Sequence, residues 1–170
     1  MLNYISYLIV LILSFCGVFI GGILALIAPE ELKRGEKYWK SLKYVFILLI
    51  IISIFYYSIK YSNMVTAILI SAAIVFLKLV KREYPAFAFV LFFSSIINQN
   101  FLLVSASLIF VYGLFIGTLG SGFFLIKKLN KYKRIDYKKI EIRNIFLALL
   151  KNNILYIIFG LVLLPLLAYL

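Results

Sequence analysis

The sequence predicts an all-α integral membrane protein: a six-helix transmembrane bundle with short inner interfacial helices. Of its 170 residues, 65% are hydrophobic and only 14% are charged, whereas a soluble domain is about half apolar and a quarter charged. The apolar residues stand in long runs rather than in the short alternation of a soluble core. The 18 lysines and arginines lie between these runs or at their ends, as expected for loops at a membrane surface.

Six apolar segments are expected to cross the bilayer as one polytopic domain covering residues 1–170. A crossing needs roughly 20 residues, with a range of about 17 to 25. The first segment lacks a basic region ahead of it and is therefore expected to be a retained span rather than a signal peptide. The fourth segment is short, which leaves open whether it crosses fully or is re-entrant. The expected spans are residues 4–28, 44–59, 64–80, 85–97, 101–126 and 154–170.

The distribution of charge predicts the orientation of these spans. Alternate loops hold all but one of the 18 basic residues, and Lys60 alone stands on the other side. Because cytoplasmic loops of membrane proteins are rich in lysine and arginine, the basic loops, near residues 29–43, 78–85 and 127–153, are expected inside. Both termini are then expected outside, in a multi-pass protein of the cell membrane.

Two loop segments are expected to form short helices at the inner surface. In "APEELKRG", Pro29 begins a helical turn, the acidic residues stand at its start, and Gly35 can end it. The apolar residues between Ile142 and Leu150 have helical spacing, which predicts an amphipathic helix on the membrane surface ahead of the last span.

Three polar side chains between the fourth and fifth segments and one within the fifth form a possible polar site. The triplet Asn98, Gln99 and Asn100 is expected to be the outer turn of a helical hairpin, because amides bond to the free backbone groups at helix ends. The alternative is that the short fourth span draws this turn below the surface, where it lines a cavity. Tyr112 is the most unusual group within a span, because its hydroxyl needs a partner at membrane depth.

Small residues recur every four positions in two of the expected spans. This spacing lets helix backbones approach closely in membranes, so these residues are expected at helix packing interfaces. Both spans run from outside to inside and can meet as a parallel pair; the alternative is that glycine is simply common in membrane helices. The residues are Gly17, Gly21 and Ala25 in the first span and Gly113, Gly117 and Ser121 in the fifth.

The residues that usually carry chemistry are scarce in this chain. It has no histidine and a single cysteine, Cys16, so the commonest catalytic base and metal ligand are missing. All six acidic residues fall in the expected inner loops, whereas proton and ion pathways use acidic groups within the membrane. The chain is therefore expected not to be an enzyme and to bind no cofactor or metal.

The basic run of the fifth loop is expected to contact anionic lipid headgroups on the inner face; plain orientation by positive charge is the alternative. Nucleic acid is not expected as a partner. The favoured function is a non-catalytic small subunit or assembly component of a membrane complex, together with other membrane subunits. The alternative is a transporter, or its substrate-binding subunit, for a neutral or apolar solute. The expected headgroup contacts are Lys127, Lys128, Lys131, Lys133, Arg134, Lys138, Lys139 and Arg143.

Overall fold

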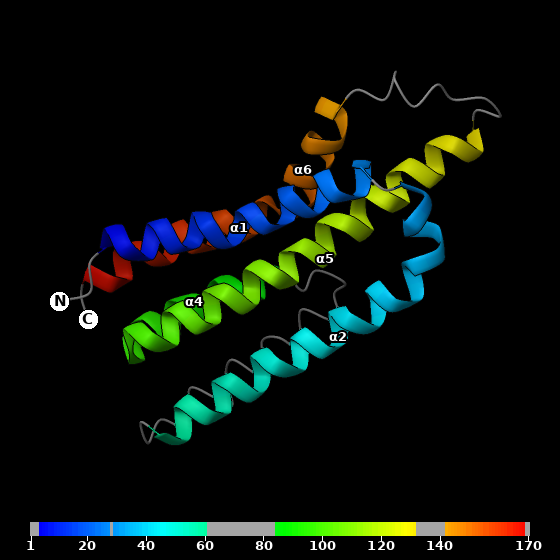
Figure 1. The fold of residues 1–170 in the computed structure, drawn as a ribbon. Helices are drawn as coiled ribbons and strands as arrows, with labels where there is room; N and C mark the ends of the chain where they lie inside the picture. The colour runs from blue at the N-terminus through cyan, green and yellow to red at the C-terminus, as the bar shows by residue number, and fades with distance from the viewer. Residues whose placement is uncertain (1–3, 28, 61–83, 132–141, 169–170) are drawn as a thin grey trace.

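The computed structural model describes residues 4–27, 29–60, 84–131 and 142–168, and these residues form an all-helical bundle without strands (Figure 1). Four of the helices are long and apolar enough to cross a membrane, which supports the prediction of a membrane protein. The elements are α1 (Tyr4–Ile27), α2 (Pro29–Lys60), α4 (Ala86–Ile97), α5 (Gln99–Lys131), α6 (Ile142–Leu163) and the short 3-10 helix η2 (Leu164–Ala168).

The predicted count of six helices is not supported, because the described residues contain five α-helices. The expected span 64–80 lies outside the described residues. The predicted inner helices are not separate elements either. The first is continuous with the following span in α2, and the second is continuous with the last span in α6.

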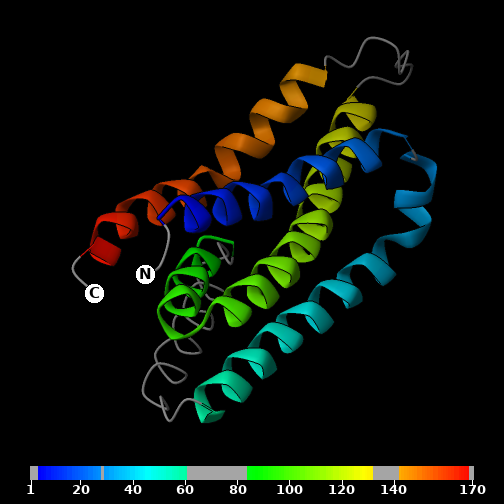
Figure 2. The same cartoon turned by 60° about the vertical axis from the view of Figure 1, so that its left-hand side comes forward.

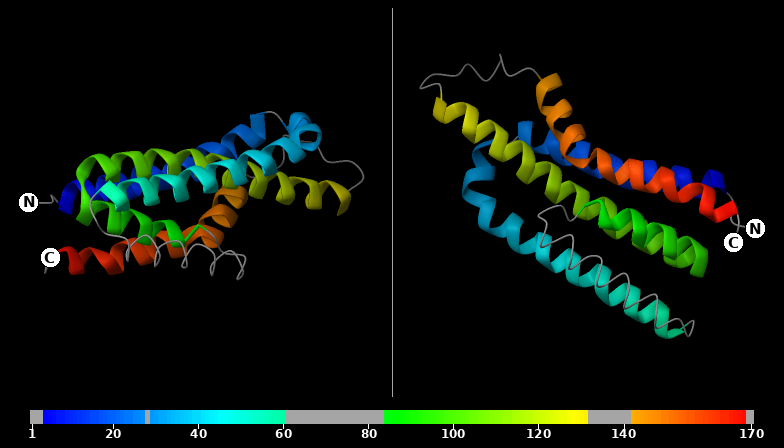
Figure 3. Two further views of the ribbon diagram at one scale, coloured as in Figure 1. Left: turned by 90° about the horizontal axis from the view of Figure 1, so that it is seen from below. Right: turned by 180° about the vertical axis from the view of Figure 1, so that it is seen from behind.

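These continuous helices have a simple physical reason. One glycine within a helix costs about 1 kcal/mol relative to alanine, so Gly35 alone does not end α2. Asn153 stays within α6 because its side-chain amide donates to the Leu149 carbonyl one turn earlier, at 2.9 Å. Both helices bend instead of breaking: the first turns of α2 and of α6 leave the axis of the remainder (Figures 2 and 3).

The ends of the described helices gather at two opposite ends of the bundle. The start of α1, the end of η2, the end of α2 and the α4–α5 turn lie at one end (Figures 1 and 3). The end of α1, the start of α2, the end of α5 and the start of α6 lie at the other. The described parts of the basic loops 29–43 and 127–153 therefore lie at the same end of the bundle.

The core lies where α4 meets α1, α5 and α6. α4 has 12 residues, or about 18 Å of helix, against a hydrocarbon core of about 30 Å. It starts beside the middle of α1, because the Tyr84 hydroxyl donates to the Ser14 carbonyl at 3.0 Å. Tyr84 and Pro85, which the charge pattern placed in an inner loop, are therefore buried within the bundle.

Candidate functional site

Side chains from four elements meet at the middle of the bundle in what we call the central cluster: Ser14 and Phe15 of α1, Tyr84 before α4, Tyr112 of α5 and Tyr156 of α6. All five are almost fully buried. The Tyr84 ring lies 4.7 Å from the Tyr156 ring and 6.3 Å from the Tyr112 ring, and the Phe15 ring stacks on Tyr156 at 5.8 Å, measured between centroids. The cluster joins the start of α4 to three spans.

The hydroxyl groups of four residues in and beside this cluster, Tyr7, Ser14, Tyr84 and Tyr156, are hydrogen-bonded within the protein. The Ser14 and Tyr156 hydroxyls are 2.6 Å apart, and Ser14 also donates to the Leu11 carbonyl. Tyr84 donates to the Ser14 carbonyl, and Tyr7 donates to the Gly160 carbonyl at 3.3 Å. An unsatisfied polar group in hydrocarbon costs several kcal/mol. This network of hydrogen bonds therefore allows a turn at Tyr84 to lie in the middle of the bundle.

Tyr112 is the one member of the cluster that the sequence predicted as a possible polar-site residue; Tyr84, Tyr156 and Ser14 were not predicted. Tyr112 is fully buried, with its ring edge-on to Phe87 at 4.8 Å, and the Lys43 ammonium lies 6.0 Å from its centroid. Tyr156 carried the same signal, since a tyrosine in an apolar stretch needs a partner for its hydroxyl, whereas Tyr84 directly follows three charged residues. Which tyrosines meet depends on helices that are distant in the sequence.

The amide triplet forms the turn between α4 and α5. Asn98 is extended, with φ −167° and ψ 143°, and ends α4. Its side-chain oxygen accepts a hydrogen bond from the Asn100 amide at 2.7 Å, which is the N-cap arrangement for α5. Gln99 and Asn100 are exposed, whereas Asn98 is half-buried. The triplet lies at the opposite end of α4 from the central cluster, so the possible polar site does not come together as one site.

The two stripes of small residues meet along α1 and α5. A Cβ at Gly17 would overlap the carbonyl of Phe110, and one at Gly21 would overlap that of Leu114. A Cβ at Gly117 would meet the carbonyl of Val18 in return. Contact positions rise together along both helices, so the pair is parallel.

Further contacts extend this interface in both directions. The Thr118 hydroxyl donates a hydrogen bond across the helices to the Gly21 carbonyl at 3.1 Å. A Cβ added at Gly113 would lie 3.1 Å from the Val18 amide nitrogen, and Ala25 and Ser121 are buried. All six small residues therefore lie where they can bring helices together.

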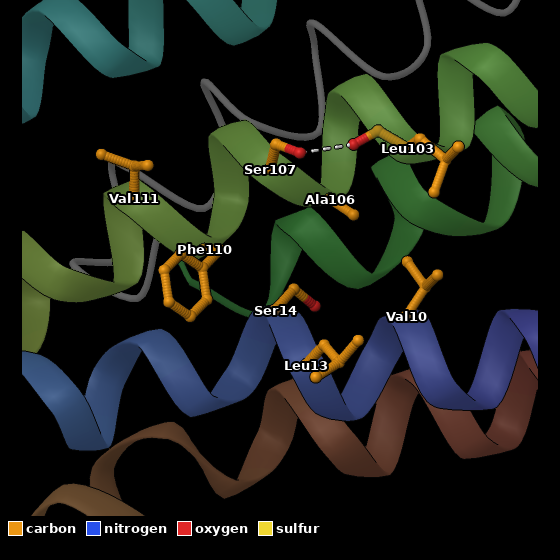
Figure 4. A pocket seen from close by; sticks show the side chains of 8 residues that line it. All are labelled: Val10, Leu13, Ser14, Leu103, Ala106, Ser107, Phe110 and Val111. Carbon is orange, nitrogen blue, oxygen red and sulfur yellow. Dashed lines mark hydrogen bonds between the residues drawn. The ribbon is translucent and has the colours of Figure 1, made fainter.

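A groove of about 350 Å³ opens on the surface between α1 and α5. Figure 4 shows its lining: Val10, Leu13, Ser14, Leu103, Ala106, Ser107, Phe110 and Val111. The Ser107 hydroxyl donates to the Leu103 carbonyl at 2.9 Å, and the Ser14 hydroxyl is held as described above. An occupant would therefore meet a mainly apolar surface whose hydroxyls are already engaged.

The expected headgroup contacts are described only in part. Lys127, Lys128 and Lys131 fall on the last turns of α5, and Arg143 is exposed on the first turn of α6. Lys133, Arg134, Lys138 and Lys139 lie outside the described residues. Within the described parts of the chain, no three histidine, cysteine or acidic residues group as metal ligands. No protein-family model, curated protein or solved structure matches this chain.

Proposed function

We propose that this chain is a non-catalytic, multi-pass component of the cell membrane that serves as a subunit or assembly factor of a larger membrane complex. The observation that carries the proposal is the central cluster, in which the buried hydroxyls of Ser14, Tyr84 and Tyr156 are bonded to one another or to backbone carbonyls. A centre packed in this way supports a structural role, because catalytic and transport sites keep polar groups available for a substrate.

Uneven burial of the spans supports the same function. In α1 and α5, 44% of the span positions are buried within the chain, against 22% in α2 and α6. Large apolar side chains such as Leu49 of α2 and Ile158 of α6 are exposed. The α1–α5 pair thus supplies a rigid core, and α2 and α6 offer the surfaces for other membrane helices.

Site-specific photo-crosslinking tests this function. A photoreactive residue at Ile158 or Leu49 in cells is expected to give a protein adduct of one defined mass from at least one of these faces. The same probe at Ile9, on the exposed face of α1, is the matched control and should give lipid adducts. Lipid adducts alone from all three positions would contradict the proposal.

The groove between α1 and α5 favours a second function, a carrier or substrate-binding subunit for a neutral or apolar solute. Its volume of about 350 Å³ falls in the range of small-molecule sites, roughly 300 to 1,000 Å³. Native mass spectrometry of the purified protein should then show a stoichiometric small molecule, which Ala106→Phe removes by filling the groove and Ala148→Phe on α6 does not. An unchanged spectrum for Ala106→Phe would exclude the groove as its site.

A further inference from the structure

We propose that the start of the α2 span is a binding site for an anionic membrane lipid, whose phosphate is held by Lys37 and Lys40 while its chain lies along Leu48 and Ile52. The inference does not rest on the proposed function, since it requires only that α2 spans a bilayer. It is also separate from the basic run of residues 127–143.

Packing against α5 fixes which way this part of α2 faces. Trp39, Lys43 and Phe46 are spaced as one helical face. Trp39 and Phe46 lie 5.6 Å and 5.2 Å from the Phe115 ring of α5, between centroids. The Lys43 ammonium lies over the ring of Tyr112, which also belongs to α5. These three contacts set the rotation of α2 about its own axis.

The opposite face then points outward with a defined order of chemistry. Lys37 lies two positions from Trp39, nearly opposite on a helix with 3.6 residues per turn. Lys37, Lys40, Tyr44 and Leu48 follow at spacings of three, four and four, so they share one face. All four are exposed, and Ile52 continues the face at 53% exposure. Along this face, the two lysines come first and match a lipid phosphate. The tyrosine follows at the level of the membrane interface, and the aliphatic side chains match the acyl chain.

Charge complementarity selects an anionic headgroup over a neutral one. Helix positions three apart have Cβ atoms roughly 5–6 Å apart, so one phosphate group can contact the ammonium groups of both Lys37 and Lys40. The surrounding stretch, residues 29–43, has five basic and three acidic residues, which leaves a positive balance. Each lysine near a membrane surface attracts anionic lipid by about 1 kcal/mol, whereas a neutral headgroup gains no such net attraction.

The only tryptophan in the sequence, Trp39, is a built-in reporter for this site. The protein is reconstituted in phosphatidylcholine vesicles that contain brominated phosphatidylglycerol or, separately, brominated phosphatidylcholine, because bromine quenches nearby tryptophan fluorescence. We expect stronger quenching by the anionic lipid at equal mole fraction, and a weaker preference at high salt because ions screen the attraction. Equal quenching by the two lipids in the unmodified protein would overturn the proposal.

Substitutions locate the site on the two lysines. The double substitution Lys37→Gln and Lys40→Gln should lower the preference for the anionic lipid by roughly fivefold for each lysine removed. Lys37→Gln alone should lower it by roughly fivefold. Lys37→Arg with Lys40→Arg should retain it. Lys60→Gln, at the other end of the same helix, is the control and should leave it unchanged. Unaltered quenching by brominated phosphatidylcholine shows that the substitutions have not changed the exposure of Trp39 to lipid. An unchanged preference in the double glutamine variant, or an equal loss in the Lys60 variant, refutes the assignment.

Discussion

Single atoms decide how closely α1 and α5 approach. At Gly117, an added Cβ would overlap the Val18 carbonyl oxygen and lie 2.9 Å from the Gly22 amide nitrogen. Both of these are backbone atoms, which cannot rotate away as a side chain does. At Gly120, one turn further on α5, a Cβ would meet only the end of the Leu149 side chain, at 3.3 Å.

Substitution of Gly117 by alanine should therefore destabilise the protein by roughly 1 to 3 kcal/mol through overpacking, and isoleucine should cost more. Gly120→Ala is the matched control. It should be neutral or slightly stabilising, since alanine is favoured over glycine in a helix by about 1 kcal/mol. Unfolding in mixed detergent micelles measures both variants. Equal stability of the two alanine variants would mean that the backbones do not meet as described.

At Tyr84, the ring and the hydroxyl group contribute different amounts of stability. Tyr84→Phe removes the hydrogen bond to the Ser14 carbonyl but leaves no unpaired donor, so a loss of about 0.6 kcal/mol is expected, as for typical hydrogen bonds between membrane helices. Tyr84→Ala also removes the ring contacts and should cost about 3 to 5 kcal/mol. Tyr38→Ala, at a side chain that is 73% exposed, should change stability little. The same unfolding measurement compares all three, and similar losses for the phenylalanine and alanine variants of Tyr84 would contradict this division.

At the scale of elements, the α4–α5 turn shows how one residue ends one helix and starts the next. Asn98 accepts the Asn100 amide through its side chain, and its own amide donates to the Ser94 carbonyl at 3.1 Å. The other two amides of the triplet are exposed. The cap is therefore a property of position 98 alone.

Asn98→Ala should lower stability by about 1 kcal/mol, the usual loss for an N-cap. Gln99→Ala and Asn100→Ala should each stay within about 0.5 kcal/mol of the unmodified protein, as is normal for exposed positions. Asn98→Asp and Asn98→Ser should retain most of the stability, because both side chains can accept the same hydrogen bond. Equal losses at all three positions would assign the triplet to a buried polar site instead.

At the scale of the whole molecule, the start of α1 and the end of η2 lie at the end of the bundle that holds the α4–α5 turn (Figure 1). The end of α5 lies at the opposite end. If the bundle spans the membrane as the charge pattern predicts, position 99 faces outward and position 131 faces the cytoplasm.

Cysteine labelling tests this orientation in a Cys16→Ser background. A membrane-impermeant thiol reagent added to intact cells should react rapidly with a cysteine at position 99, and with one at position 131 only after the cells are opened. The permeabilised cells serve as the control for reactivity at position 131. Labelling of position 131 from outside would reverse the orientation.

The sequence by itself determined the class of fold and most of the helix positions. Long apolar runs need no tertiary information, because the bilayer selects helices by length and hydrophobicity alone. The turn at Asn98 and the spacing of Gly17, Gly21, Gly113 and Gly117 were equally local. The merged helices could not be predicted in the same way, since the interfacial residues near Gly35 and Ile145 are compatible with either a break or a bend.

The sequence predicts the short length of α4, but only the tertiary structure decided that this helix starts at the centre of the bundle. From the sequence, Pro85 predicts a helix start but not its depth, which depends on the Tyr84 hydroxyl reaching the Ser14 carbonyl, 70 residues away in the chain. The meeting of Tyr84, Tyr112 and Tyr156 likewise joins three distant segments. Local pattern reports which groups need partners, whereas packing between helices determines which partners they find, because each contact depends on the rotation and depth of two helices at once.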